Sequence, residues 1–315
     1  MAPEVVVIGS YVQDLTWRCA EFPRAGETIV GTFVTGPGGK GSNQAIAAGR
    51  AGARTLFVGA VGRDAFADEA RRFYEENGIG ARWVEKPKQA TGTAGILVSE
   101  SGQNEIVVAL GANAFLSRKD LVLQEIERAR ILVVQLESNL ATAAAALKIA
   151  RKAGVATVLN PAPMRAEFDP AMLRSVDILV PNETEFTALV NRLAVGGRTD
   201  FREEELATLS PETVHGLCRG LGVETVIVTL GRRGCLVSRQ SGCTAIPAFS
   251  VKAVDTTGAG DAFVGGFAAG WVRQGGDIEA AARFGNAVAA LSVTRLGTAP
   301  SMPRAREIAA FLKKR

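Results

Sequence analysis

The amino-acid sequence predicts an α/β fold in which a mostly parallel central sheet is covered by helices on both faces. Short, nearly continuous apolar runs rich in β-branched residues recur along the chain, which is typical of strands buried on both sides. Helical patterns stand between these runs, and this alternation favours βαβ units that share one parallel sheet. The predicted strands are 5–9, 55–61, 131–135, 156–159, 177–180 and 225–230. The predicted helices are 43–50, 64–77, 119–128, 141–153 and 183–193.

Two segments, 14–34 and 93–110, break this alternation because they lack a helical period and show strand-like alternation. We therefore predict a few strands outside the main sheet, and such an excursion from an α/β core often serves as a lid. The polar segment 191–211 is predicted to be a surface insertion. The resulting division is an α/β core of 1–10, 37–91 and 112–315, with a β-lid of 11–36 and 92–111.

Composition narrows the class of protein. The chain has 315 residues, of which 47% are hydrophobic, so it can form one large domain or two small ones with a sizeable core. Its net charge is only +4, and its basic and acidic residues are interspersed, which gives little support to a nucleic-acid partner. The scattered cysteines predict reduced thiols. No secretory signal or membrane span is expected, so the cytoplasm is the expected location.

The segment 255–261 carries the strongest chemical signal, because three small residues directly precede Asp261 at the start of an apolar helix. Small residues leave backbone N–H groups open, and a helix N-terminus adds partial positive charge, so we predict an anion hole for a transferring phosphoryl group. Asp261 at its mouth could accept the proton of an attacking hydroxyl. Spacing alone also fits an aspartate that merely caps a helix. The three small residues are Gly258, Ala259 and Gly260.

A second glycine-rich segment, 36–44, leads into an alanine-rich helix. Its glycines allow a ligand to approach the backbone closely, while Lys40 and Asn43 offer hydrogen-bond donors to hydroxyls or phosphate. The spacing is not that of a Walker loop. A glycine turn with a solvated lysine is the alternative interpretation.

Two further segments follow predicted strands, and ligands bind at the carboxyl ends of parallel strands. Asn182 and Glu185 share one helix face, and an acid there can hold the waters of Mg²⁺, although an ordinary acidic first turn fits as well. The segment 229–234 could wrap a nucleotide or be a turn with two exposed arginines. The only histidine, His215, falls in a predicted surface helix, which argues against a Ser-His-Asp site.

Together these segments resemble the ribokinase family of sugar kinases, also called the PfkB family. The resemblance is an ordered set of motifs across nearly the whole chain. It implies a ribokinase-like three-layer sandwich with a small β-sheet lid, ATP and Mg²⁺ as cofactors, and a homodimer formed through the lid. Its matching segments are 9–14, 38–45, 111–114, 135–138, 160–163, 181–185, 229–231, 255–261 and 293–295.

The resemblance also implies a role for each matching residue. Asp261 would be the catalytic base, with the backbone of 258–260 as the anion hole. The sugar would contact Val12, Asp14, Gly38, Gly39, Lys40, Asn43 and Glu137. The ATP site would comprise Asn182, Thr229, Gly231, Gly234 and Asn286, with Glu185 acting on Mg²⁺ through water. A monovalent cation, usually K⁺, would be held by Asp255, Thr257, Ser292, Arg295, Gly297 and Ser301, several of them through carbonyls.

One position departs from the ribokinase pattern. Ribokinases usually carry asparagine two residues before the aspartate that matches Asp14, and here that residue is Val12. Valine cannot pair with a sugar hydroxyl, and burying a hydroxyl unpaired costs roughly 1–3 kcal/mol. Deoxyribokinases are similar to this chain in having an apolar residue there. The expected substrate is therefore D-ribose or 2-deoxy-D-ribose.

Three alternatives stay open at this point. The first is a kinase for another furanose or a nucleoside, similar to fructokinase or adenosine kinase. A non-catalytic sugar sensor that has kept the fold is the second. A dinucleotide-dependent oxidoreductase is disfavoured, because no GxGxxG follows the first predicted strand.

Overall fold

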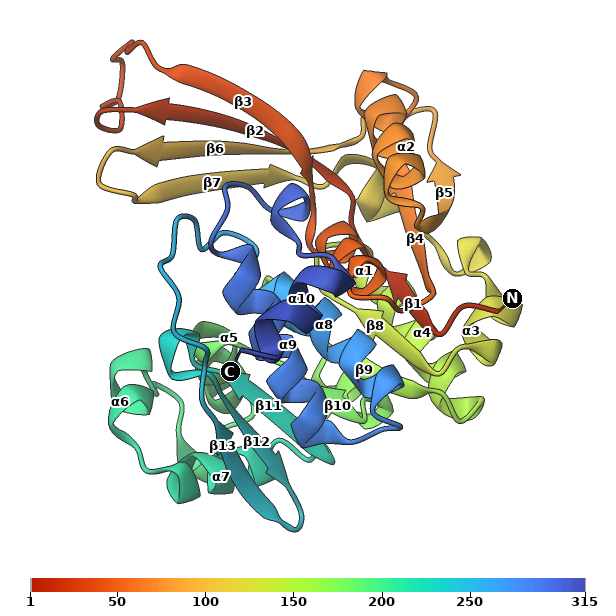
Figure 1. Cartoon of the computed structure of the whole chain (residues 1–315), viewed down its shortest axis with the longest axis vertical. Helices are drawn as coiled ribbons and strands as arrows, with labels where there is room; N and C mark the ends of the chain where they lie inside the picture. Colours follow the sequence, from red (N-terminus) through yellow and green to blue (C-terminus); the bar gives the residue numbers. More distant parts are fainter. Residues whose placement is uncertain (1, 315) are drawn as a thin grey trace.

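The computed structural model describes residues 2–314, which form a three-layer core with a second, smaller sheet at one end (Figure 1). The central sheet has nine strands in the order β13-β12-β11-β10-β9-β8-β1-β4-β5. Neighbours from β5 to β11 pair in parallel, while β12 and β13 are antiparallel, so the predicted mostly parallel sheet is confirmed. The strands are β1 (Val5–Ile8), β4 (Thr55–Val61), β5 (Gly80–Glu85), β8 (Ile131–Val134), β9 (Ala156–Leu159), β10 (Ile178–Leu179), β11 (Thr225–Thr229), β12 (Cys235–Arg239) and β13 (Gly242–Ile246).

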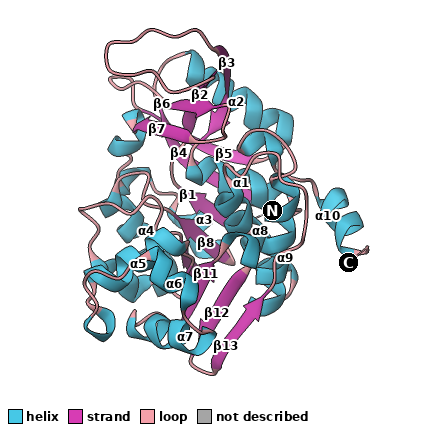
Figure 2. Cartoon of the chain, turned by 90° about the vertical axis from the view of Figure 1, so that its left-hand side faces the viewer, coloured by secondary structure: helices cyan, strands magenta, loops and turns pink. Residues whose placement is uncertain are grey.

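Helices cover both faces of this sheet, and alternate residues of each central strand point into two separate hydrophobic layers (Figure 2). In β1, for example, Val5 and Val7 pack in one layer, while Val6 and Ile8 pack in the other. One layer is completed by α1 (Lys40–Arg50), α2 (Ala65–Asn77), α8 (Ala259–Arg273), α9 (Ile278–Ser292) and α10 (Ala305–Leu312). The other is completed by α3 (Leu123–Arg128), α4 (Leu140–Lys152), α5 (Glu183–Arg192), α6 (Glu203–Thr208) and α7 (Pro211–Gly220).

The second sheet is built from the two segments that broke the βα alternation. Its four strands follow the order β3-β2-β6-β7, and in Figure 1 they project beyond the core. Among residues 2–314, the one buried hydrophobic cluster within this sheet consists of Val12, Ala94 and Ile96. Its function as a lid stays a prediction. The strands are β2 (Val12–Cys19), β3 (Thr32–Gly38), β6 (Gly92–Ser99) and β7 (Asn104–Ala109).

Several predicted boundaries differ from the structure. The strands β5, β12 and β13 were not predicted, because polar residues interrupt their apolar runs. The predicted helix 119–128 is reduced to α3, preceded by a 3₁₀ turn at Arg118–Asp120. The predicted surface insertion 191–211 contains α6, and its Phe201 and Leu206 are buried in the core. Among residues 2–314, no helix combines the length and apolar character that crossing a membrane requires.

Candidate active site

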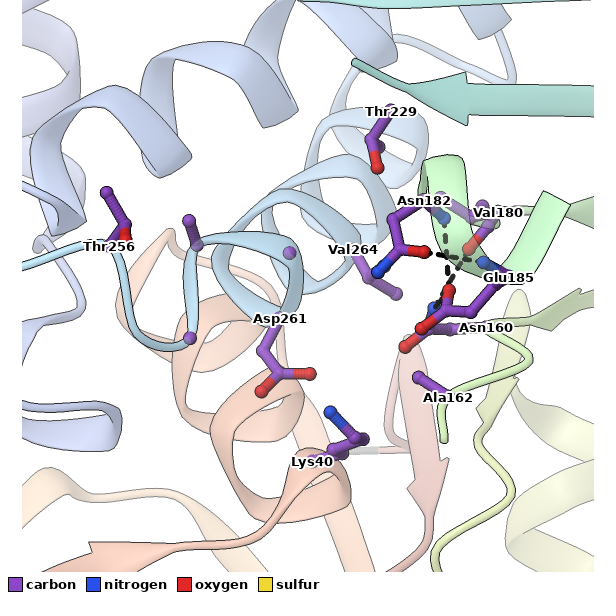
Figure 3. A pocket seen from close by; sticks show the side chains of 13 residues that line it. Lys40, Asn160, Ala162, Val180, Asn182, Glu185, Thr229, Thr256, Asp261 and Val264 are labelled. Carbon is purple, nitrogen blue, oxygen red and sulfur yellow. Dashed lines mark hydrogen bonds between the residues drawn. The ribbon is translucent and has the colours of Figure 1, made fainter. Parts of the chain in front are cut away.

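Two adjoining hollows meet at the carboxyl ends of the central strands. The strand-end pocket lies beyond β9, β10 and β11 (Figure 3), and the inter-sheet pocket lies between the second sheet and the core. Lys40, Gly258 and Asp261 line both, so they mark the junction. The strand-end pocket is also lined by Asn160, Ala162, Val180, Asn182, Glu185, Thr229, Thr256, Ala259, Gly260 and Val264. The inter-sheet pocket is also lined by Val12, Asp14, Gly39, Asn43, Ala94, Ile96, Ile106, Val108, Glu137, Pro163, Thr257 and Thr298.

Asp261, in the first turn of α8, is held at this junction by two side-chain amides. Asn43 Nδ2 donates to Asp261 Oδ2 at 2.9 Å, and Gln44 Nε2 donates to Asp261 Oδ1 at 2.9 Å. Both amides come from α1, which packs tightly against α8. An added Cβ at Gly265 would lie 2.3 Å from the Gln44 carbonyl oxygen, so only glycine permits this close approach. The carboxylate is therefore oriented by a rigid pair of helices.

The backbone before Asp261 offers open amide groups. Gly258 adopts φ 76° and ends the loop before α8. The amide of Ala259 donates to the Thr256 carbonyl at 3.2 Å. Within residues 2–314, the amides of Gly258, Gly260 and Asp261 have no hydrogen-bond partner. Free amides at a helix N-terminus can hold an anion, and here they belong to Gly258, Gly260 and Asp261 rather than to Ala259.

Lys40 brings positive charge to the same junction, and Figure 3 shows its side chain beside Asp261. Burial would lower the pKa of Lys40, but surrounding carboxylates raise it, and the net shift is upward. The amine therefore stays charged at neutral pH and can contact a second anion such as phosphate. Those carboxylates, in falling order of effect, are Asp261, Glu137, Glu185 and Asp14.

The inter-sheet pocket contains two carboxylates besides Asp261. Glu137 Oε2 accepts hydrogen bonds from Ser10 Oγ at 2.6 Å and from the Lys40 amide at 2.9 Å. Asp14, on β2, lies against Gly38, where an added Cβ would come within 2.3 Å of Asp14 Oδ2. Burial raises the pKa of Asp14 to about 7, so this carboxyl changes charge near neutral pH.

The same pocket combines a free acceptor with an apolar wall. Asn43 is 4% exposed, and its Oδ1 has no hydrogen-bond partner in the described part of the chain. A buried unpaired acceptor carries a desolvation cost that a ligand hydroxyl would remove. Val12 is 2% exposed and packs with Ala94 and Ile96. One wall of the pocket therefore suits the hydroxyl groups of a ligand, and the other suits its carbon atoms.

A chain of buried amides connects Asp261 with Glu185, and no role was predicted for it from the sequence. Gln135 Nε2 donates to Gln44 Oε1 at 2.6 Å, and Gln44 Nε2 donates to Asn160 Oδ1 at 3.0 Å as well as to Asp261. Asn160 Nδ2 reaches Glu185 Oε2 at 3.4 Å. The three amides lie in predicted motifs, but only the fold brings their side chains together.

Asn182 and Glu185 cap α5 and also line the strand-end pocket. Asn182 Oδ1 accepts from the Glu185 amide at 2.8 Å, and Glu185 Oε2 accepts from the Asn182 amide at 3.0 Å. This capping box leaves Glu185 Oε1 without a partner among residues 2–314. Burial raises the pKa of Glu185 above its ordinary value. The free oxygen fits a water of a hydrated Mg²⁺ ion.

Three residues predicted for the nucleotide line neither pocket. Gly231 and Gly234 have φ 52° and 94°, and they shape the turn between β11 and β12. Asn286 Nδ2 donates to the carbonyls of Ile246 at 3.2 Å and Pro247 at 3.3 Å. In this structure Asn286 therefore holds the end of β13, while Thr229 does line the strand-end pocket.

The residues predicted to hold a monovalent cation lie on the loop before α8, at the last residue of α9 and on the segment that follows α9. Asp255 Oδ1 accepts from the Thr257 amide at 2.9 Å, and its Oδ2 accepts from the Gly297 amide at 3.0 Å. Ser301 Oγ donates to the Thr298 carbonyl, the Ser292 carbonyl accepts from the Arg295 amide, and the Arg295 guanidinium pairs with Glu307.

Among the described residues, no three His, Cys, Asp or Glu side chains form a metal cluster. One carboxylate amid carbonyls and hydroxyls is a donor set of low charge, which fits a monovalent cation better than a divalent one.

Comparison with known proteins places this geometry in context. A model of the pfkB family of carbohydrate kinases matches residues 2–305. The chain is 37% identical over 316 residues to a deoxyribokinase from Salmonella typhi, covering 98% of each chain. It is also 37% identical over 317 residues to a ribokinase from Haemophilus influenzae, covering 99% of each.

Solved structures give the same result for the fold. A ribokinase from Giardia lamblia superposes with a TM-score of 0.90 at 33% identity, covering 100% of this chain and 99% of that one. An Arabidopsis thaliana ribokinase complexed with ribose and ATP superposes with a TM-score of 0.84 at 32% identity, covering 99% of each chain. The predicted ribokinase-like sandwich is therefore confirmed.

Proposed function

Because the chain belongs to the pfkB family of carbohydrate kinases, we propose that it transfers the γ-phosphate of ATP to the primary 5-hydroxyl of D-ribose or 2-deoxy-D-ribose. The observation that carries this proposal is the position of Asp261 at the junction of the two pockets, beside open amides. A sugar in the inter-sheet pocket and a nucleotide in the strand-end pocket would meet at this carboxylate.

Each pocket supplies groups that suit its proposed ligand. In the inter-sheet pocket, Asp14 and the free Asn43 Oδ1 accept hydrogen bonds from sugar hydroxyls. In the strand-end pocket, Asn182 and Thr229 offer polar contacts at the ends of two strands, where parallel sheets bind nucleotides. Lys40 faces both ligands with its positive charge.

Asp261 acts as the general base of the proposed reaction. It removes the proton of the primary hydroxyl as the oxygen attacks, and the amides of Gly258 and Gly260 stabilise the charge on the transferring group. The bonds from Asn43 and Gln44 keep the carboxylate in position. Closure of the second sheet over the sugar would exclude water and so limit wasteful hydrolysis of ATP.

Two ions belong to this proposal. Mg²⁺ would supply positive charge to the phosphate oxygens, and Glu185 would hold it through water. The loops of Asp255 and Gly297 would hold a monovalent cation, whose charge would add to that of the anion hole.

The choice between the two pentoses depends on Val12. Its side chain belongs to an apolar wall, which suits the methylene of 2-deoxyribose better than the 2-hydroxyl of ribose. We expect kcat/KM to favour 2-deoxyribose, and the curated relatives include kinases of both names. Equal or better use of ribose would contradict this argument.

The outer face of the second sheet fits a homodimer contact. Ile106 and Val108 line the inter-sheet pocket, so Val107 between them points to the opposite face, where it is 78% exposed. Trp17 and Phe33, with ring centroids 5.1 Å apart, are also largely exposed. Apolar patches of this kind mark interfaces. Light scattering of the wild type and of Val107→Lys tests this contact, and a monomeric wild type would contradict it.

One experiment tests the function as a whole. Purified protein is given ATP, Mg²⁺ and in turn ribose, 2-deoxyribose, fructose or a nucleoside, with and without K⁺, and ADP release is measured. We expect turnover with a pentose. No turnover of either pentose in any condition, alongside turnover of a nucleoside or of fructose, would replace the proposed substrate.

A further inference from the structure

Thr298 connects the C-terminal loop to the second sheet, and sequence reasoning gave it no role. It lies between α9 and α10, directly before the 3₁₀ turn Ala299–Ser301. Its Oγ1 is 3.0 Å from Asp14 Oδ2 and 3.2 Å from the Pro37 carbonyl oxygen. Asp14 belongs to β2 and Pro37 to β3, so one hydroxyl reaches two strands at the rim of the inter-sheet pocket.

A hydroxyl has a single proton, so it can donate to only one of these two acceptors at a time. When Asp14 is ionised, the Thr298 proton goes to its carboxylate. When Asp14 is protonated, the carboxyl itself can donate to Thr298 Oγ1, and Thr298 can then donate to Pro37. The Thr298 hydroxyl is thus the donor that stabilises the ionised form of Asp14.

That stabilisation matters because the surroundings of Asp14 mostly disfavour its charge. Burial has the largest effect and raises its pKa, Glu137 and Asp261 also raise it, and the net pKa is about 7. The hydrogen bond from Thr298 lowers the pKa, as does the positive charge of Lys40. The neighbouring Tyr11 phenol is buried and neutral, because burial raises its pKa above the ordinary value.

We propose that Thr298 is a positioning residue of the sugar site, whose hydroxyl orients the Asp14 carboxylate toward the substrate and joins the C-terminal loop to β2 and β3. This inference rests on the proposed function, in which Asp14 binds the sugar. Thr298 holds the carboxylate in its charged form, so its loss weakens sugar binding most where Asp14 is only partly ionised.

The loop around Thr298 is anchored independently of its hydroxyl. Arg50 Nη1 donates to the carbonyls of Ala299, Pro300 and Met302, at 3.2, 2.8 and 2.9 Å. The Thr298 carbonyl accepts from the amide of Ser301 at 3.1 Å and from its hydroxyl at 2.8 Å. Removing the Thr298 hydroxyl therefore leaves the path of the loop in place.

The test compares Thr298→Val, which replaces the hydroxyl by a methyl group, with Thr298→Ser, which keeps the hydroxyl. For each, kcat and KM for the pentose are measured from about pH 5.5 to about pH 9. In Thr298→Val, KM near neutral pH should rise about 10-fold, in line with losing one hydrogen bond to a charged group. The acidic limb of kcat/KM should move about one pH unit upward, since one unit equals a tenfold change in ionisation.

The expected pattern has three further parts. The change in KM should shrink toward pH 9, kcat at saturating sugar should change less than about 3-fold, and Thr298→Ser should stay near the wild type. In an Asp14→Asn background, Thr298→Val should add little, because the two changes remove the same interaction. If Thr298→Val does not fold, Thr298→Ala removes the same hydroxyl with less bulk.

Other outcomes would overturn the inference. Thr298 would have only a structural role if the pH profile of Thr298→Val matched that of the wild type. The same conclusion would follow if kcat and KM changed by equal factors at every pH, or if Thr298→Ser were as impaired as Thr298→Val. A wild-type protein that phosphorylates no pentose would instead contradict the proposed function. Failure of the Thr298 inference and failure of the proposed function are therefore distinguishable.

Discussion

The central sheet and the second sheet hold their site residues in different ways. In the central sheet, every residue of β1 and β8 is buried, and helices cover both faces. In the second sheet, every residue of β7 is exposed, and only three side chains form a buried cluster. The proposed catalytic side of the site therefore rests on close packing, whereas the proposed sugar side depends on a few hydrogen bonds and one close glycine contact.

Asp261 and Asp14 illustrate this difference within one pocket. Asp261 accepts from two amides of α1, a helix whose residues Gly41–Ala48 are all buried. Asp14 accepts from one hydroxyl, which comes from a loop 284 residues away in the sequence. The Asp261 carboxylate is thus held in position by two hydrogen bonds, whereas the position and charge of the Asp14 carboxylate depend on a single one.

The largest effect is expected at the packed side of the site. Asp261→Asn keeps the size of the side chain but removes the base, so kcat should fall at least ~10²-fold, the lower end of general-base contributions. Steady-state kinetics with the preferred pentose measure it, with circular dichroism to confirm that the fold is kept. A near-normal kcat would remove Asp261 from its proposed role.

The free energy of unfolding should respond very differently to substitutions in the two sheets. Leu132, in β8, is 0% exposed, so Leu132→Ala should lower the free energy of unfolding by about 2–5 kcal/mol. Val107→Ala, on the open face of β7, should change it by no more than about 0.5 kcal/mol. Denaturant titration of both variants gives the comparison. A loss at Val107 as large as that at Leu132 would show that a partner buries the second sheet.

A pair of glycines on β3 tests the sugar side alone. A Cβ at Gly38 would lie 2.3 Å from Asp14 Oδ2, so Gly38→Ala must displace the carboxylate, and KM for the pentose should rise about 10-fold or more. At Gly36, on the same strand, an added Cβ meets nothing within 4 Å, which makes Gly36→Ala the matched control. Similar KM values for both variants would argue against contact between Asp14 and the sugar.

The smallest effect is a dependence on pH. Because the pKa of Asp14 is raised to about 7, its carboxylate forms as pH rises through that value. Sugar hydroxyls bind the carboxylate better than the neutral acid, so kcat/KM should increase with pH to about 8 and then level off. A pH series with the wild type and Asp14→Asn measures it, and the variant should lack this rise. The same rise in both would assign it to another group.

Features confined to short stretches of chain could be predicted from sequence. The inner strands were predicted because burial on both faces leaves an uninterrupted apolar run. The edge strands β5 and β13 and the neighbouring strand β12 were missed, since polar residues interrupt their apolar runs. The loop before Asp261 was predicted from its own small residues, yet the engagement of the Ala259 amide with Thr256 depends on the detailed path of the backbone.

The sequence by itself determined the parallel core, the glycine loop and the set of motifs that marks the family. Each of these features depends on residues that lie close together in the chain. Only the tertiary structure decided how the site is held. The bonds from Gln44 to Asn160 and from Thr298 to Asp14 span 116 and 284 residues, and Asn286 turned out to hold β13. Such pairings carry no local periodicity, and they exist only because folding brings distant side chains within hydrogen-bond distance.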